Sequence, residues 1–506
     1  MKYVNPVRRG MYPDPSVVRV GEYYYMVNST FEYYPGISVS RSSDLVNWES
    51  LPGVAFETSQ ADLRSSRSNE GIFAVCIRYH DGHFYVVTTN FAEFRTFIIR
   101  GRLEGDGIVW EDGRIEVDVK GIDPDIYFED GRMYLQFTGY VNDKGLKALQ
   151  QVEINPETGD ILRGPEIICY GTGGRDVEGP HIVRNKGWYY LLAAEGGTGQ
   201  GHMITVFRSK NLWGPYEYEP GVNPLFTNRD RAEEPLQNIG HADLFKDENG
   251  CWWMTCLGTR PAQVGFSQIT NIGRETLLYP VRWDGDWPEI YNGVPTAEVD
   301  LTGFPEHEKA VGKQRFDGLL DDFSNGSISN EWLTLRDSLG ENLRVEEGCL
   351  RLRGSNVKLS DLGTPAFAGV RQAEHQETFE VGLSGETDPG DGYLGLAVII
   401  DAAHYAEIAF CRAEEGGYDV FRKQMVADVE IDQKEGHLDE LPDELRLVNE
   451  KDRKIFTVSS GTQSVSFAVA AINLSNEALA ALNTGDIEGI HAYGDSLLSV
   501  KKVTRK

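Results

Sequence analysis

Three carboxylic acids in the first half of the chain stand in similar local settings. Asp14 lies in the segment YPDP, Asp123 in IDPD and Glu178 in VEGP, and each precedes apolar residues typical of a β-strand. Because proline fixes its own φ and restricts the residue before it, the backbone around such an acid is held in place. Two carboxyl groups that face each other across a cavity can cleave a glycosidic bond, one as a general acid and the other as a general base. A third carboxylate nearby raises the pKa of the proton donor.

Each acid, taken alone, is equally typical of a turn that leads into a strand. Their spacing relative to a repeated feature favours a shared role. Tight glycine turns followed by aromatic residues recur at intervals of about 50 to 60 residues, the length of one four-stranded propeller blade with its loops. The turns contain Gly21, Gly82, Gly131, Gly187 and Gly250. We therefore predict five blades, each with an inner hairpin at one of these glycines.

Ionisable or aromatic side chains occupy related positions before these turns. Counting back seven to nine residues from each glycine reaches Asp14, Phe73, Asp123, Glu178 and His241. The innermost strand of a propeller blade runs along the central channel, so these residues should meet at the channel mouth. Three acids in one place repel each other, which is costly and favours a functional explanation.

Several longer motifs follow one another along the chain: NPVRRGMYPDPSVVRVGEYYYMV, GIDPDIYFEDGRMYLQFTG, DVEGPHIVRNKGWYYLLAAEGGTGQGHM, NIGHADLF and NIGRETLLYPVRWDGDWP. In this order they resemble the motifs of glycoside hydrolase family 43, the β-xylosidase and α-L-arabinofuranosidase family. The resemblance implies a five-bladed β-propeller catalytic domain, which we place at residues 1–305. It also implies hydrolysis with inversion, by an exo-acting enzyme that releases terminal β-D-xylosyl or α-L-arabinofuranosyl units from xylo- or arabino-oligosaccharides.

The resemblance also implies roles for individual acids. Asp14 matches the general base that activates water, Glu178 matches the general acid, and Asp123 matches the residue that holds and tunes this acid. Asp125, two residues further on, should face the same side by strand alternation. The family generally has a small polar residue there, and we interpret Asp125 as a charge on the blade.

Four further residues match positions that contact the substrate in the family. Arg274, in GRET, would hold sugar hydroxyls with its guanidinium fork, and His241, in GHAD, would lie at the floor of the pocket. Phe31 and Phe73 would provide surfaces against which a pentose ring packs. The alternatives are a surface ion pair for the arginine and core positions for the other three side chains. Tryptophan is usual in the family at position 73, so the choice between xylose and arabinose stays open.

The hairpin repeat stops near residue 300, and we interpret the charged segment PEHEKAVGKQRFDG that follows as a linker. In residues 316–506, short alternating runs such as TFEVGLSG, YLGLAVIID and YAEIAFCR follow one another between polar turns. This pattern predicts an antiparallel β-sandwich, and it resembles the lectin-like jelly-roll domain of the β-xylosidase branch. The acidic stretch KEGHLDELPDELRL has no assignment, and SNEALAALNTG is compatible with a short helix. The predicted fold class is therefore all-β, a five-bladed propeller followed by a sandwich.

Composition excludes several classes of partner. A formal charge of −29, from 49 Lys and Arg against 78 Asp and Glu, repels nucleic acid and anionic membranes, whereas a neutral oligosaccharide remains a suitable substrate. No apolar stretch has the length of a signal peptide or membrane span, which predicts a cytoplasmic protein. The six cysteines lack CxxC pairs and zinc spacing, and we interpret them as reduced core residues. No cofactor is expected to be required. A structural calcium ion near His241 and a homo-oligomer are hypotheses taken from the family.

Two rival functions are compatible with a propeller. A retaining five-bladed glycosidase of the invertase type uses an Asp nucleophile in an N-D-P-N context, whereas this chain has Y-P-D-P around Asp14. A non-catalytic carbohydrate-binding propeller predicts that at least one of the three acids is replaced, and all three are present. The inverting hydrolase is therefore the preferred hypothesis.

Overall fold

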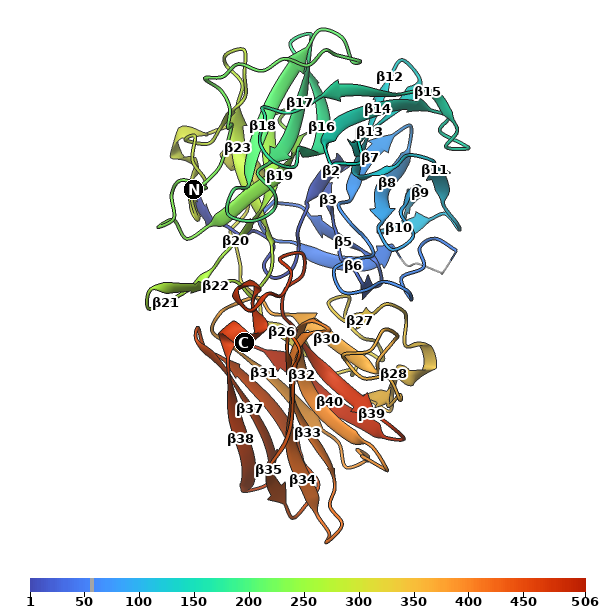
Figure 1. Cartoon of the computed structure of the whole chain (residues 1–506), viewed down its shortest axis with the longest axis vertical. Helices are drawn as coiled ribbons and strands as arrows, with labels where there is room; N and C mark the ends of the chain where they lie inside the picture. Colours follow the sequence, from blue (N-terminus) through green and yellow to red (C-terminus); the bar gives the residue numbers. More distant parts are fainter. Residues whose placement is uncertain (55–58) are drawn as a thin grey trace.

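Two bodies of β-structure lie one above the other in the computed structural model, which describes residues 1–54 and 59–506 (Figure 1). The first half of the chain builds a propeller and the second half a sandwich, so the predicted all-β fold is confirmed. The helices of the described residues are 3-10 turns: η1 (Leu301–Gly303), η2 (His307–Ala310), η3 (Gly340–Asn342), η4 (Ala471–Leu474) and η5 (Asn476–Ala478). None of these turns is long or apolar enough to cross a membrane.

Five separate sheets form the blades, as predicted, and they follow one another around a central axis (Figure 1). Blade one contains β2 (Ser16–Val20), β3 (Tyr23–Asn28), β5 (Ile37–Ser42) and β6 (Glu49–Val54). Blade two contains β7 (Cys76–His80), β8 (His83–Asn90), β9 (Arg95–Glu104), β10 (Gly107–Trp110) and β11 (Ile115–Val117). Blade three contains β12 (Gly121–Glu129), β13 (Arg132–Tyr140), β14 (Lys147–Ile154) and β15 (Ile161–Cys169). Blade four contains β16 (Glu178–Asn185), β17 (Trp188–Glu195) and β18 (Met203–Ser209), and blade five contains β19 (Gln237–Lys246), β20 (Trp252–Thr259), β23 (Glu275–Arg282) and β24 (Glu289–Ile290).

The inner hairpin of each blade turns at one of the predicted glycines. All five of these glycines have a positive φ, between 62° and 82°. In blades two, three and four the residue before the glycine also has a positive φ, which is the pattern of a type I′ turn; these residues are Asp81, Asp130 and Lys186. The repeat read from the sequence is therefore a repeat of hairpin geometry.

The ends of the propeller segment are tied together. β1 (Lys2–Val4) pairs antiparallel with β25 (Glu298–Asp300), which brings Tyr3 opposite Val299. A separate hairpin, β21 (Ala262–Val264) and β22 (Ser267–Ile269), leaves blade five and extends toward the sandwich (Figure 1). Its apolar residues form a small buried cluster with Ala471 of the second domain.

Two antiparallel sheets of eight strands each enclose the core of the sandwich. One sheet contains β26 (Leu319–Asp321), β28 (Leu343–Glu346), β29 (Cys349–Arg353), β31 (Glu377–Leu383), β36 (Glu444–Asn449), β37 (Arg453–Ser460), β38 (Gln463–Ala470) and β40 (Leu497–Arg505). The other contains β27 (Leu333–Leu335), β30 (Phe367–Arg371), β32 (Tyr393–Asp401), β33 (His404–Arg412), β34 (Tyr418–Val426), β35 (Val429–Leu438), β39 (Ile487–Tyr493) and, from the propeller, β4 (Tyr33–Tyr34). Because β4 pairs with β27, the two domains share a sheet edge.

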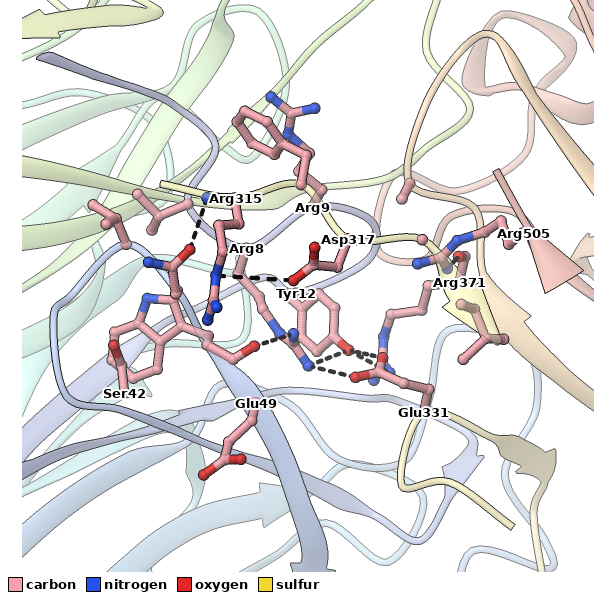
Figure 2. A pocket seen from close by; sticks show the side chains of 18 of the residues that line it. Arg8, Arg9, Tyr12, Ser42, Glu49, Arg315, Asp317, Glu331, Arg371 and Arg505 are labelled. Atoms are coloured by element: carbon pink, nitrogen blue, oxygen red, sulfur yellow. Dashed lines mark hydrogen bonds and ion pairs between the residues drawn. The ribbon is translucent and has the colours of Figure 1, made fainter. Parts of the chain in front are cut away.

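Arginine side chains also join the two domains. Arg371 of the sandwich is 3% exposed; its Nε donates to the Met11 carbonyl, and its guanidinium lies 4.0 Å from the ring centroid of Tyr12. Arg8 of the propeller forms an ion pair with Glu331 of the sandwich at 3.1 Å. These side chains line a cavity of about 830 Å³ at the seam between the domains (Figure 2). The cavity lies apart from the predicted catalytic acids, none of which is among its described lining residues.

Candidate active site

Asp14 lies just before β2, at the mouth of the propeller channel, and is 4% exposed. Its Oδ2 accepts a hydrogen bond from Ser29 Oγ, and its Oδ1 lies 3.2 Å from Arg274 Nη1 and 3.7 Å from His241 Nδ1. Burial raises the pKa of this carboxyl, but the Arg274 charge, the histidine and the serine hydrogen bond outweigh burial and hold the pKa below its usual value. Asp14 is therefore ionised at neutral pH.

Asp123 and Glu178 reach the same mouth from neighbouring blades. Asp123 lies in β12 and is 8% exposed; burial, followed by the charges of Glu178 and Asp14, raises the pKa of Asp123 well above its usual value. Glu178 is the first residue of β16. Burial raises its pKa as well, although Lys147 Nζ, 3.2 Å from Glu178 Oε2, opposes the rise.

The three acids thus differ in their readiness to hold a proton. Asp14 is kept ionised, whereas the pKa values of Asp123 and Glu178 are raised. Carboxyl groups whose pKa values are pushed apart by their surroundings are what acid–base hydrolysis of a glycosidic bond requires. The arrangement can therefore supply a base and a proton donor to one bound substrate.

The backbone presents several of these side chains in an uncommon conformation. Asp14, Asp123 and His241 have φ values of 51°, 53° and 47°, in the left-handed region. Register shifts interrupt the strand ladders around Asp123 in β12 and around His241 in β19. Left-handed residues and β-bulges concentrate at functional sites, where they redirect a side chain. Glu178 does not have a positive φ; in blade four the next residue, Gly179, has the left-handed conformation, with a φ of 62°.

Aromatic side chains form one wall beside the acids. Phe31 is 2% exposed, and its ring lies 5.6 Å from the ring of Phe73 in an edge-to-face arrangement. Phe73 in turn stacks on Phe91, with centroids 4.4 Å apart and an interplanar angle of 4°. The structure therefore brings together the two predicted phenylalanines and adds Phe91, which the sequence analysis did not identify. Phe73 and Phe91 are partly exposed and can offer apolar surface to the face of a sugar ring, whereas Phe31 is buried.

Arg274 connects the acids to the second domain. Besides Asp14, it donates from Nη1 to Thr198 Oγ1 at 3.2 Å and from Nη2 to the Asn483 carbonyl at 3.4 Å. The segment around Asn483 belongs to the sandwich. It passes so close to the propeller that a Cβ on Gly273 would lie 3.0 Å from Gly485 Cα. The sandwich therefore contributes backbone to the rim of the site.

Two histidines lie near Asp14, and both are neutral. Burial lowers the pKa of His241 to about 4, and it does the same for His202, whose Nδ1 lies 3.1 Å from the Asn238 carbonyl. His241, which the resemblance places at the floor of the pocket, is therefore an uncharged imidazole beside Asp14. His202 was not predicted, although it lies in the quoted motif GQGHM.

The channel below the acids contains an internal cation. Arg78 is paired with Asp125 at 2.8 Å and with Asp243 at 2.7 Å, and its Nη2 lies 3.3 Å from His181 Nδ1. Asp125, which the sequence analysis interpreted as a charge on the blade, is fully buried and paired with Arg78. The assembled blades show that Arg78 neutralises it.

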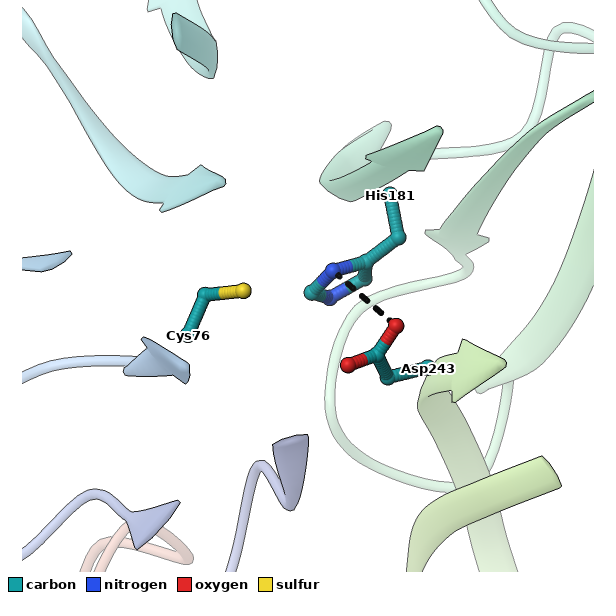
Figure 3. A group of neighbouring side chains, drawn as sticks. All are labelled: Cys76, His181 and Asp243. Atoms are coloured by element: carbon teal, nitrogen blue, oxygen red, sulfur yellow. Dashed lines mark ion pairs between the residues drawn. The ribbon is translucent and has the colours of Figure 1, made fainter. Parts of the chain in front are cut away.

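This channel does not fit a calcium ion. Within residues 1–54 and 59–506, the side chains close enough to share a metal are Cys76, His181 and Asp243, drawn in Figure 3. Calcium prefers six to eight oxygen ligands, whereas this set offers a thiol and an imidazole beside one carboxylate. The charge of that carboxylate, Asp243, is already neutralised by its ion pair with Arg78. Removing Arg78 would leave uncompensated buried charge, at a cost of about 3–5 kcal/mol in the free energy of folding. The channel therefore needs Arg78 as its cation.

Comparisons with known proteins agree with this geometry. Residues 3–288 match the family described as glycosyl hydrolases family 43. The chain belongs to glycosyl hydrolase family 43. Residues 320–497 match the beta xylosidase C-terminal concanavalin A-like domain. The predicted family is thus confirmed, the protein is a glycoside hydrolase, and its sandwich is of the concanavalin A type.

Relatives of this family 43 protein come from bacteria and a fungus. The chain is 34% identical over 410 residues to a non-reducing end alpha-L-arabinofuranosidase of Bacteroides ovatus, covering 80% of this chain and 75% of the relative. It is 35% identical to xylosidase/arabinosidase 43B of Humicola insolens, covering 82% and 78%. Among solved structures, a xylan beta-1,4-xylosidase of Bacillus halodurans superposes with a TM-score of 0.88 at 26% identity, covering 99% of both chains.

Proposed function

We propose that the protein is an exo-acting, inverting glycoside hydrolase that releases terminal β-D-xylosyl or α-L-arabinofuranosyl units from short oligosaccharides. One observation carries the proposal: Asp14 is held ionised at the channel mouth while burial raises the pKa of Glu178 at the same mouth. A single displacement needs a base and an acid that are in these states at the same time.

The proposed reaction has one chemical step. Asp14 accepts a proton from a water molecule as the water oxygen bonds to the anomeric carbon. The bond from that carbon to the leaving oxygen breaks, and Glu178 donates its proton to this oxygen. Burial keeps the pKa of the donor Glu178 raised, Asp123 lies close enough to interact with its charge, and Arg274 keeps Asp14 ionised. No step uses a cofactor, and we propose that Arg78 supplies the positive charge that the channel needs.

The surroundings of the acids support a pentose as the bound sugar. Phe73, packed against the buried Phe31, offers a partly exposed apolar wall, while Arg274 carries donors suited to hydroxyl groups. The sandwich segment at Asn483 limits the mouth on one side, which supports a pocket that receives a chain end. The relatives are named for arabinofuranosidase or xylosidase activity, or for both, and we accordingly keep both sugars in the proposal.

A product analysis tests this function. The protein should hydrolyse nitrophenyl β-D-xyloside or nitrophenyl α-L-arabinofuranoside, and it should shorten the trisaccharide of the preferred sugar, xylotriose or arabinotriose, by one terminal unit at a time. Chromatography at early times should show the monosaccharide and the disaccharide in equal amounts. Accumulation of xylobiose from long xylan without free xylose would indicate internal cleavage and contradict the exo assignment.

A further inference from the structure

Glu178 is contacted by a charged pair that the proposed mechanism does not yet use. Lys147, the first residue of β14 in blade three, extends its Nζ to 3.2 Å from Glu178 Oε2 and 3.2 Å from Asp176 Oδ1. The lysine side chain is only 15% exposed. A lysine from one blade is therefore held between two carboxylates of the next blade, directly at the candidate proton donor.

The contact distinguishes the two oxygens of the Glu178 carboxyl. The ammonium group of Lys147 is a donor without acceptor capacity, so Oε2 must accept its hydrogen bond. Among the described residues, Oε1 of Glu178 has no hydrogen-bond partner. The proton of the neutral carboxyl therefore belongs on Oε1, the oxygen left free to meet a leaving group.

Opposing charges act on this carboxyl from several elements. Lys147 lowers the pKa of Glu178, whereas Asp176, from the segment before β16, and Asp14, from blade one, raise it. Asp123, from blade three, interacts with it as well. Burial is the largest influence and raises the pKa. The final value is a balance in which the lysine is the principal opposing charge.

We propose that Lys147 and Asp176 are positioning residues that fix the orientation of the Glu178 carboxyl and set the upper pH limit of its proton donation. This inference rests on the proposed role of Glu178 as the general acid. Lys147 anchors Oε2, and Asp176 anchors Lys147. Asp176 is itself held by Arg175, whose Nε lies 2.9 Å from Asp176 Oδ2.

The pH dependence of kcat/KM for xylobiose tests the proposal, since its basic limb reports the loss of the donor's proton. Lys147→Met removes the charge that lowers the pKa of Glu178, so the basic limb should move to higher pH. Asp176→Asn removes a charge that raises this pKa, so the limb should move to lower pH. Each shift should be about one pH unit, the smaller end of what an opposite or like charge at this distance produces.

The same variants separate positioning from general damage. Lys147→Met should lower kcat for xylobiose at least 10-fold more than kcat for a nitrophenyl xyloside, because only the disaccharide needs a well-placed proton. Lys147→Arg keeps the charge and should retain the wild-type profile. Lys144→Met, on the exposed turn just before β14, is the matched control and should change neither quantity.

Opposite shifts of the basic limb in Lys147→Met and Asp176→Asn would support the proposal. Unshifted limbs, or shifts in the same direction, would overturn it, and circular dichroism and thermal unfolding would verify that the variants are folded. A wild-type protein without glycosidase activity would instead refute the proposed function, so the two failures are distinguishable.

Discussion

Glu178→Gln is expected to lower kcat for xylobiose by about 10³-fold, while kcat for a xyloside with a nitrophenyl leaving group falls far less. Glutamine keeps the size of the side chain and can still accept from Lys147, but it has no proton to give. A sugar alkoxide is a poor leaving group and needs that proton, whereas a nitrophenolate leaves without it. Steady-state kinetics on the two substrates measures the difference.

A matched control accompanies this variant. Glu217→Gln changes an exposed carboxylate of the same blade region, and both rates should stay at the wild-type value. Equal losses on the disaccharide and the aryl xyloside in Glu178→Gln would remove Glu178 from the role of proton donor.

Asp14→Asn should lower kcat on both substrates to a similar extent, by about 10²- to 10⁴-fold. The attacking water needs a base whatever the leaving group is, so an activated leaving group cannot compensate. The amide retains the shape that fits between Ser29 and Arg274 but carries no charge. Measurement of kcat for xylobiose and for the nitrophenyl xyloside gives the ratio directly.

The two acid variants should therefore be distinguishable by pattern as well as by size. Asp118→Asn, at an exposed position next to Lys120, is the control and should leave both rates unchanged. If Asp14→Asn spared the aryl substrate as Glu178→Gln is expected to do, Asp14 would be acting on the leaving group and the two roles would have to be exchanged.

Much of the fold was predictable because its repeat is carried by local chemistry. A hairpin turn needs a positive φ, glycine supplies it, and the aromatic residues that follow suit a half-buried strand. The blades could therefore be counted from the glycines alone. The acidic stretch of residues 434–447 was harder, since its charges obscured an ordinary strand. Leu445 and Leu447 alternate with polar residues in β36 and are fully buried. Of the acids before them, Glu435 lies in β35 and Glu444 in β36, and the other three lie between the two strands.

The candidate site was predictable only in part, because its contacts depend on how the blades are arranged around the axis. Asp14 and Asp123 each lie two residues before a channel side chain, Ser16 and Asp125, whereas Glu178 lies three residues before His181. The distance between each acid and its turn glycine does not show that the next channel side chain lies one residue further along in blade four.

Two cations of the site were missed for the same reason. Lys147 opens a third strand and Arg78 lies within an inner strand, and neither stands beside an acid in the sequence. Their roles appear only when neighbouring blades are brought together. The five positions before the glycines therefore predicted where side chains converge, but not which charges balance them.

The configuration of the sugar first released tests the central claim most directly, because it depends on whether water attacks the anomeric carbon in one step. Proton NMR of wild-type hydrolysis of nitrophenyl β-D-xyloside, recorded before mutarotation, should show α-xylose as the initial product. Initial formation of β-xylose would mean that a carboxylate has formed a covalent intermediate with the sugar, and it would contradict the pairing of Asp14 as base with Glu178 as acid.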